Sequence, residues 1–212
     1  MKNKRNFFTA AALLLFLFPL RGLGSFLYAQ DTIRFTWERE DGYYYYTRSF
    51  YITATENKKF TIDWGDGDID TITGVGTAKQ KISHRCGSFL QYYDVTIAAM
   101  TPDCHFTVFR CTENRLAFLD LSKCVELDTL ICLKNQLATL DLSNNTELSY
   151  LDCPNNQLTA LDLSNNTKLL RLNCSNNQLA ALNPSNNTEL VYLNCSNNLL
   201  TALNPSNNTK LE

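Results

Sequence analysis

The chain has 212 residues with a formal net charge of -2, and its length suffices for one or two domains. A near-neutral balance with scattered lysines and arginines gives no electrostatic basis for binding nucleic acid. The only histidines, His84 and His105, lie in no recognisable nucleophile or metal motif, and the G-x-S-x-G, H-E-x-x-H and P-loop motifs are absent. We therefore expect no enzymatic activity, no cofactor and no metal.

Residues 1–29 have the three-part layout of a secretory signal peptide. Lys2, Lys4 and Arg5 precede an apolar run at residues 7–20, and Ala29 is a small residue before polar sequence. A membrane anchor is the alternative, but the run is shorter than the roughly 20 residues that a spanning helix needs. The sequence thus predicts export and removal of residues 1–29, leaving a mature chain without a membrane span that is secreted or at the cell surface.

Residues 30–104 predict an N-terminal β-sandwich. Apolar and aromatic side chains alternate in short runs that glycine- and aspartate-rich turns separate, as is typical of all-β domains. The clearest runs are residues 50–54, 59–64 and 93–98.

Two phrases in this segment resemble the PKD-type immunoglobulin-like domain. They are W-G-D-G at residues 64–67 and Y-x-V-T-I at residues 93–97. The resemblance implies a spacer or capping module. The sequence departs from that family at His84-Arg85-Cys86, which stands where the family has an H-x-Y phrase, and in the irregular loop that follows.

Four aspartates surround the W-G-D-G phrase, and several carboxylates together could bind calcium. The spacing does not fit an EF-hand loop, because counting from Asp66 places Thr71 where glycine is required and Thr77 where glutamate is required. Aspartate and glycine are also the preferred residues of tight turns. We therefore favour turn chemistry over calcium for Asp63, Asp66, Asp68 and Asp70.

From residue 106 onward the sequence repeats every 21 residues without insertion or deletion. Each row reads L-x-x-L-x-C-x-x-N-x-L, which resembles the leucine-rich repeat with cysteine at the third leucine position. Neighbouring coils of such a repeat lie about 4.8 Å apart, so like side chains stack and the leucines form a continuous apolar core. The sequence predicts about five short parallel strands and a return side without a full helix. The first column is Phe106, Leu127, Leu148, Leu169, Leu190 and Leu211.

Two columns of asparagine are expected to bond backbone groups that the bends leave unpaired, because an amide both donates and accepts. The first column is Asn114, Asn135, Asn156, Asn177 and Asn198. The second, on the opposite corner, is Asn145, Asn166, Asn187 and Asn208, with Cys124 in the first row. The Asn-Asn-Thr sequons at Asn144, Asn165, Asn186 and Asn207 are read as turn residues, not as glycan acceptors.

Five of the eight cysteines form a further column: Cys111, Cys132, Cys153, Cys174 and Cys195. Their spacing fits none of the short paired spacings of zinc sites. We favour buried thiols that act as small apolar side chains. Stacked disulfides stay open on distance alone, since bridged Cα atoms lie 4.4–6.8 Å apart. Outside the column, we hypothesise that Cys104 pairs with Cys86 or Cys124 at the solenoid's N-terminal edge.

Residues beside the inward leucines point outward, onto the concave face in a leucine-rich repeat. Tyr150, Arg171 and Tyr192 would stand side by side there, and tyrosine and arginine are enriched at interface hot spots. Ile131 and Leu133 are expected to be exposed apolar contacts on the same face. Alternatively, Arg171 only stacks between the tyrosines as a solvated cation–π ladder. The predicted ligand-binding set is Tyr150, Arg171, Tyr192, Asp152, Asn173, Asn194, Ile131 and Leu133.

The rows with a cysteine column are most similar to internalin-type bacterial surface proteins, over residues 106–212. That resemblance implies adhesion to a protein or glycan ligand on host or neighbouring cells. The main alternative is a structural spacer with no ligand of its own.

The predicted fold is mainly β, with a PKD/Ig-like β-sandwich at residues 30–104 followed by a leucine-rich-repeat solenoid at residues 105–212. Solenoids need capped ends, and residue 212 follows no polar capping repeat. We therefore expect a solenoid truncated at its C-terminal end.

Overall fold

The computed structural model describes residues 30–38, 46–86 and 92–212, so the predicted signal peptide lies outside the described residues. These ranges form twelve strands and no helix, and the mainly β prediction is confirmed. Accordingly, they contain no helix long and apolar enough to cross a membrane. The strands are β1 (Thr32–Glu38), β2 (Tyr46–Ala54), β3 (Lys59–Asp63), β4 (Ile69–Thr73), β5 (Gln80–Cys86), β6 (Tyr92–Ala99), β7 (Phe106–Arg110), β8 (Leu116–Asp120), β9 (Thr129–Ile131), β10 (Tyr150–Asp152), β11 (Arg171–Asn173) and β12 (Tyr192–Asn194).

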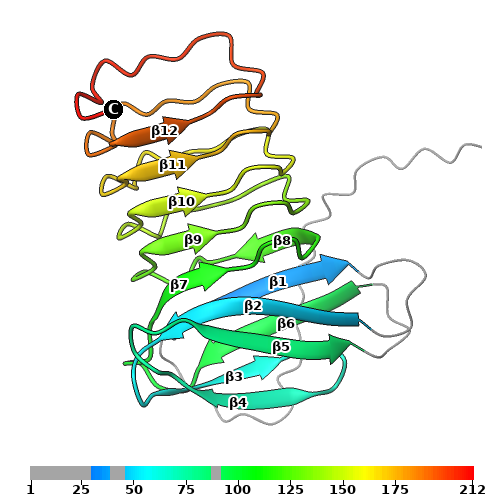
Figure 1. The fold of residues 1–212 in the computed structure, drawn as a ribbon. Helices are drawn as coiled ribbons and strands as arrows, with labels where there is room; N and C mark the ends of the chain where they lie inside the picture. The colour runs from blue at the N-terminus through cyan, green and yellow to red at the C-terminus, as the bar shows by residue number, and fades with distance from the viewer. Residues whose placement is uncertain (1–29, 39–45, 87–91) are drawn as a thin grey trace, which may run out of the picture.

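The strands form two sheets (Figure 1). One sheet has the order β4-β3-β6-β1-β8, and its neighbouring strands are antiparallel. The other has the order β12-β11-β10-β9-β7-β2-β5, in which β7 and β9 to β12 run parallel while β2 is antiparallel to both β5 and β7. The parallel strands of the repeat therefore continue directly into the N-terminal strands.

Aromatic side chains from both sheets pack against one another. The ring of Phe35 in β1 lies 5.8 Å from the ring of Phe50 in β2 and 5.8 Å from that of Phe109 in β7. Phe60 in β3 makes an edge contact with Phe106 in β7 at 5.5 Å. All five side chains are buried, and each such burial stabilises the fold by about 1.5–3 kcal/mol. The N-terminal strands and the first repeat row therefore share one core.

The first repeat row belongs to both parts of the chain. Strands β7 and β8 carry the repeat pattern, yet they pair antiparallel with β2 and β1. An uncovered first coil would expose unpaired backbone groups and the ends of the apolar columns. In this row Cys124, at the position of the second asparagine column, donates its thiol hydrogen to the carbonyl of Thr32 at 3.4 Å. Two strand pairs thus cross the expected boundary between residues 104 and 105.

The solenoid makes about four turns, which connect β7, β9, β10, β11 and β12 in continuous register. The leucine columns are buried as the repeat predicts, and Leu127, Leu148, Leu169 and Leu190 are fully inaccessible. Only in the last rows are the column leucines half-buried, at Leu193, Leu200 and Leu211. The return segments between the parallel strands β9 to β12 form turns without strands or helices. This agrees with rows too short for a full helix.

The first asparagine column works as predicted. The side-chain amide of Asn156 donates to the carbonyls of Cys132 at 2.9 Å and Cys153 at 3.1 Å. Its oxygen accepts a hydrogen bond from the backbone N–H of Leu137 at 3.1 Å. The same bonds recur from row to row at Asn135, Asn177 and Asn198. Both functions of the amide are therefore used.

The second asparagine column donates hydrogen bonds as expected but does not accept them. Asn166 donates to the carbonyls of Leu142 at 3.1 Å and Asn145 at 2.9 Å. Its side-chain oxygen, however, is buried and accepts no hydrogen bond from any described residue, as is also true of Asn145, Asn187 and Asn208. At this corner the amide only donates, so the expected acceptor role is wrong. The sequon asparagines donate to carbonyls of the preceding coil, as turn residues do, at Asn144, Asn165, Asn186 and Asn207.

The column cysteines are free thiols, buried except for Cys195, which is half-buried in the last row. Burial raises the pKa of Cys174 to about 12 and holds the pKa of Cys132 and Cys153 well above the usual thiol range. Cys104 and Cys124 are also free thiols, so the hypothesised bridge at Cys104 is not formed. The Cys124 sulfur instead bonds to a backbone carbonyl of β1.

Candidate functional site

The outward side chains of the parallel strands form two rows, which we call the strand face. Register aligns Tyr150 with Arg171 and Arg171 with Tyr192, while the leucine between the two outward positions of each strand points into the core. The second row aligns Asp152, Asn173 and Asn194 in the same way. Because every row has the same length, side chains 21 residues apart in the sequence become direct neighbours.

The first row is aromatic and cationic. The guanidinium carbon of Arg171 lies 4.5 Å from the centroid of the Tyr192 ring, and both side chains are exposed. This cation–π contact holds the guanidinium N–H groups at the surface, where they can still donate to a ligand. A shallow hollow of about 120 Å³ lies between the rows and is lined by Tyr150, Leu151, Asp152, Arg171, Asn173 and Tyr192.

The second row is a chain of polar contacts. Asn173 donates to the carboxylate of Asp152 at 2.9 Å and accepts from the hydroxyl of Ser175 at 2.8 Å. Ser196 donates to Asn194 at the same distance. Partial burial raises the pKa of Asp152, against the opposing effects of the Asn173 hydrogen bond and the Arg110 charge. These hydrogen bonds fix the orientation of the side chains, so a ligand would meet preoriented donors and acceptors.

The two apolar residues predicted on this face are less accessible than expected. Ile131 is only 9% exposed, and Leu133 is half-buried. Ile131 lies in register between Arg110 and Asp152, and the long apolar stem of an arginine at paired-strand spacing can cover a neighbouring isoleucine. The expectation that Ile131 is an exposed contact is wrong.

The strand face continues beyond the repeat. Arg110 in β7 is in register with Ile131 on one side and with Tyr51 in β2 on the other, and Tyr51 is in register with Lys81 in β5. The Arg110 guanidinium lies 5.9 Å from the Tyr51 ring, a second arginine–tyrosine contact on the same surface. Sequence reasoning missed Tyr51 and Lys81, because nothing in the repeat period indicates which N-terminal strand pairs with β7.

The return side carries a larger hollow, of about 290 Å³, whose walls include Thr139, Asp141, Thr159 and Asp162. Its carboxylates already serve the turns. Asp141 accepts the backbone N–H of Ser143, and this hydrogen bond lowers the Asp141 pKa; Asp162 has the same arrangement one row on. We therefore assign this side to turn formation.

The aspartates near the W-G-D-G phrase take part in the turn between β3 and β4. Asp63 accepts the N–H of Gly65 at 3.0 Å, and Asp66 accepts the N–H of Asp68 at 3.2 Å. Asp70 accepts the indole N–H of the buried Trp64 at 2.8 Å. Two of the four carboxylates, those of Asp63 and Asp66, therefore have the predicted turn role, whereas Asp70 bonds a buried side chain instead.

No family model and no curated protein matches the chain. Among solved structures, the functional domain of InlJ from Listeria monocytogenes, which includes a cysteine ladder, is 40% identical with a TM-score of 0.49. The match covers 50% of this chain and 24% of that chain. This chain therefore corresponds to about a quarter of the length of the InlJ structure that it matches.

Proposed function

We propose that the protein is an exported, non-catalytic binding module that adheres to a protein or glycan on host or neighbouring cells through the strand face. One observation carries this proposal: Tyr150, Arg171 and Tyr192 form an aromatic and cationic row in continuous register, in which Arg171 and Tyr192 are exposed and Tyr150 is half-buried. Export is proposed from residues 1–29, and the internalin-type repeat pattern supports a surface or secreted location.

The strand face is separate from the residues that hold the fold together. Leucines, cysteines and the asparagine columns fill the interior and bond the corners, whereas Arg171 and Tyr192 point to solvent. Large side chains with polar tips on a rigid support are the type that dominates binding energy at protein interfaces. The proposed contact set also includes Asp152, Asn173, Asn194 and the half-buried Leu133.

We further propose that residues 30–104 form a PKD-type immunoglobulin-like β-sandwich that caps the first coil of the 105–212 solenoid. The pairing of β1 with β8 and of β2 with β7 supports the capping role. The same pairing supports a second role, because it extends the strand face onto Tyr51 and Lys81. A module that serves only as a spacer would not require these outward side chains.

Adhesion of protein-coated beads to cell surfaces tests the proposal. The double substitution Tyr150→Ala with Tyr192→Ala should weaken binding at least about tenfold, the effect of losing a hot-spot contact. The matched control is Thr139→Ala with Thr159→Ala on the return side, which should bind like the natural protein. Thermal unfolding of both variants shows that each still folds. Equal adhesion by the two folded double variants would support the structural-spacer alternative instead.

A further inference from the structure

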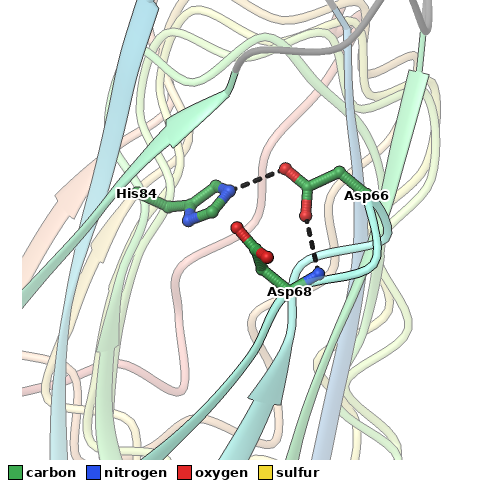
Figure 2. Close-up of side chains that lie close together, drawn as sticks. All are labelled: Asp66, Asp68 and His84. Carbon is green, nitrogen blue, oxygen red and sulfur yellow. Dashed lines mark hydrogen bonds and ion pairs between the residues drawn. The ribbon is translucent and has the colours of Figure 1, made fainter.

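We propose that Asp66, Asp68 and His84 form a binding site for a divalent transition-metal ion of the Zn²⁺ class (Figure 2). One ligand atom from each side chain lies within 4.8 Å of the other two. The carboxylates come from the turn between β3 and β4, and the imidazole comes from β5. Because His84 approaches from a different strand, the spacing of the aspartates alone could not indicate this site.

The imidazole is held in place before any ion binds. Its ring stacks on the buried indole of Trp64 with centroids 4.5 Å apart and an interplanar angle of 10°. The His84 side chain is only 11% exposed, and its Nε2 lies 2.7 Å from Oδ2 of Asp66. A ring fixed in this way has one nitrogen directed at the carboxylates, which is the preorganisation that a metal ligand needs.

No lysine or arginine among the described residues balances the negative charge of the carboxylates at this site. The Asp66 side chain is only 9% exposed and lies beside the second carboxylate, that of Asp68 (Figure 2). Within the part of the chain that the structure describes, neither carboxylate forms an ion pair with a lysine or arginine. A desolvated carboxylate next to another one is costly unless a cation compensates it. A divalent ion would supply that compensation.

The donor set indicates the class of ion. Calcium takes six to eight oxygen ligands, whereas three protein ligands that include an imidazole nitrogen are typical of zinc and related ions. A tetrahedral ion with ligand distances near 2.0–2.2 Å sets its donor atoms roughly 3.4 Å apart. To reach that spacing, Nε2 of His84 and Oδ2 of Asp66, which lie 2.7 Å apart, would separate slightly, and the Asp68 carboxylate, within 4.8 Å of both, would move closer. Water would fill the remaining position.

The competing interpretation is that His84 only donates a hydrogen bond to Asp66 and packs on Trp64. Asp68 separates the two interpretations. Its carboxylate accepts no hydrogen bond from any described residue, whereas its backbone N–H serves the turn, and asparagine keeps that N–H. The substitution Asp68→Asn therefore removes a metal ligand without touching the hydrogen bond or the stacked rings.

Zinc titration of the chelator-treated protein, followed by calorimetry and by thermal unfolding, tests the site. The natural chain should bind one zinc ion here and gain thermal stability. Asp68→Asn should bind zinc at least about tenfold more weakly, while without zinc it unfolds at a temperature no lower than that of the natural chain, because one of two adjacent carboxylates is gone. The control Asp63→Asn makes the same charge change in the same turn, keeps the acceptor for Gly65 and should bind zinc normally.

Cobalt substitution distinguishes this site from the thiols. Cobalt bound by one nitrogen and two carboxylates gives d–d absorption without a thiolate charge-transfer band. At a cobalt concentration that half-saturates the natural chain, Asp68→Asn should lose most of that absorption. The proposal is overturned by any of three outcomes: no saturable zinc binding to the natural chain, equal zinc affinity in Asp68→Asn, or a cobalt spectrum with thiolate bands that the variant retains.

Discussion

The carboxylate of Asp31 accepts a hydrogen bond from the backbone N–H of Phe106 at 2.8 Å, across 75 residues of sequence. His105 also approaches Asp31, with Nδ1 at 3.4 Å from its Oδ1. The Asp31 residue is only 4% exposed. One buried carboxylate thus ties the first N-terminal strand to the first row of the repeat.

Asp31 should make stability depend on pH. Burial raises its pKa above the unfolded value of 3.8, against the opposing effects of Phe106 and His105. Because the pKa is raised, folding favours the protonated form of Asp31. The stability that this carboxyl group contributes is therefore fully present below pH 3.8 and is lost as pH rises through the folded-state pKa. Asp31→Asn keeps an acceptor for Phe106 and removes the charge, so we expect it to be more stable than the natural protein near neutral pH.

This stability difference should shrink toward zero as pH falls to the unfolded pKa. Urea unfolding of both proteins at a series of pH values measures it. A difference that stays constant with pH, or that grows on acidification, would show that Asp31 is not the titrating group.

Substitution in the first asparagine column should lower the free energy of unfolding far more than substitution of the exposed asparagines beside it. Asn156→Asp replaces two donated hydrogen bonds with a buried carboxylate facing the carbonyls of Cys132 and Cys153. We expect a loss of at least about 3 kcal/mol, seen as a fall of roughly 6–12 °C in Tm. The control Asn155→Asp changes an exposed residue with φ of 56° and should stay within about 0.5 kcal/mol. Equal effects of the two substitutions would contradict the bonding pattern of the corner.

Thiol reactivity should follow position in the column. The thiolate is the reactive form, and burial raises the pKa of every cysteine in the column, most strongly in the fully buried middle rows. Cys195, which is half-buried, should therefore be alkylated first under native conditions. Mass spectrometry after brief iodoacetamide treatment identifies the site, and Cys195→Ser should remove the fast phase. Equally fast labelling of Cys132 or Cys153 would mean that the column is open to solvent.

The cysteine column should not tolerate the leucine that other leucine-rich repeats carry at this position. Cys153 is fully buried and lies between the equivalent cysteines of the adjacent rows, Cys132 and Cys174. Cys153→Leu adds volume to a filled column, and we expect it to cost about 1–3 kcal/mol in thermal or denaturant unfolding. Cys153→Ala measures the cost of simply losing the sulfur. A stabilised Cys153→Leu variant would show that the column contains spare volume.

The repeat could be predicted from sequence because each row contacts only its neighbours, so a constant period of 21 residues fixes which side chains meet. That is why the Asn156 bonds and the alignment of Arg171 with Tyr192 follow from the row pattern. The acceptor half of the second column could not be predicted, because the orientation of the Asn166 oxygen depends on the local backbone at that corner.

Contacts that involve segments outside the repeat could not be predicted from the sequence. The pairing of Tyr51 with Arg110 joins β2 to β7, and the approach of His84 to Asp66 joins β5 to the turn after β3. Neither has a periodic signal, since the first depends on which N-terminal strand pairs with β7 and the second on how β5 of one sheet lies against the turn after β3 of the other. The burial of Ile131 has no periodic signal either, because its two neighbours on the flanking strands, Arg110 and Asp152, are not equivalent.

Photo-crosslinking tests the proposed binding face most directly. A photoreactive phenylalanine analogue replaces Tyr192 in one variant and Thr159, on the return side, in the other, and each protein is illuminated on a cell surface. We expect covalent adducts with a cell-surface protein or glycan from position 192 and none from position 159. Adducts from position 159 alone, or from neither position while the natural protein adheres, would contradict binding through the strand face.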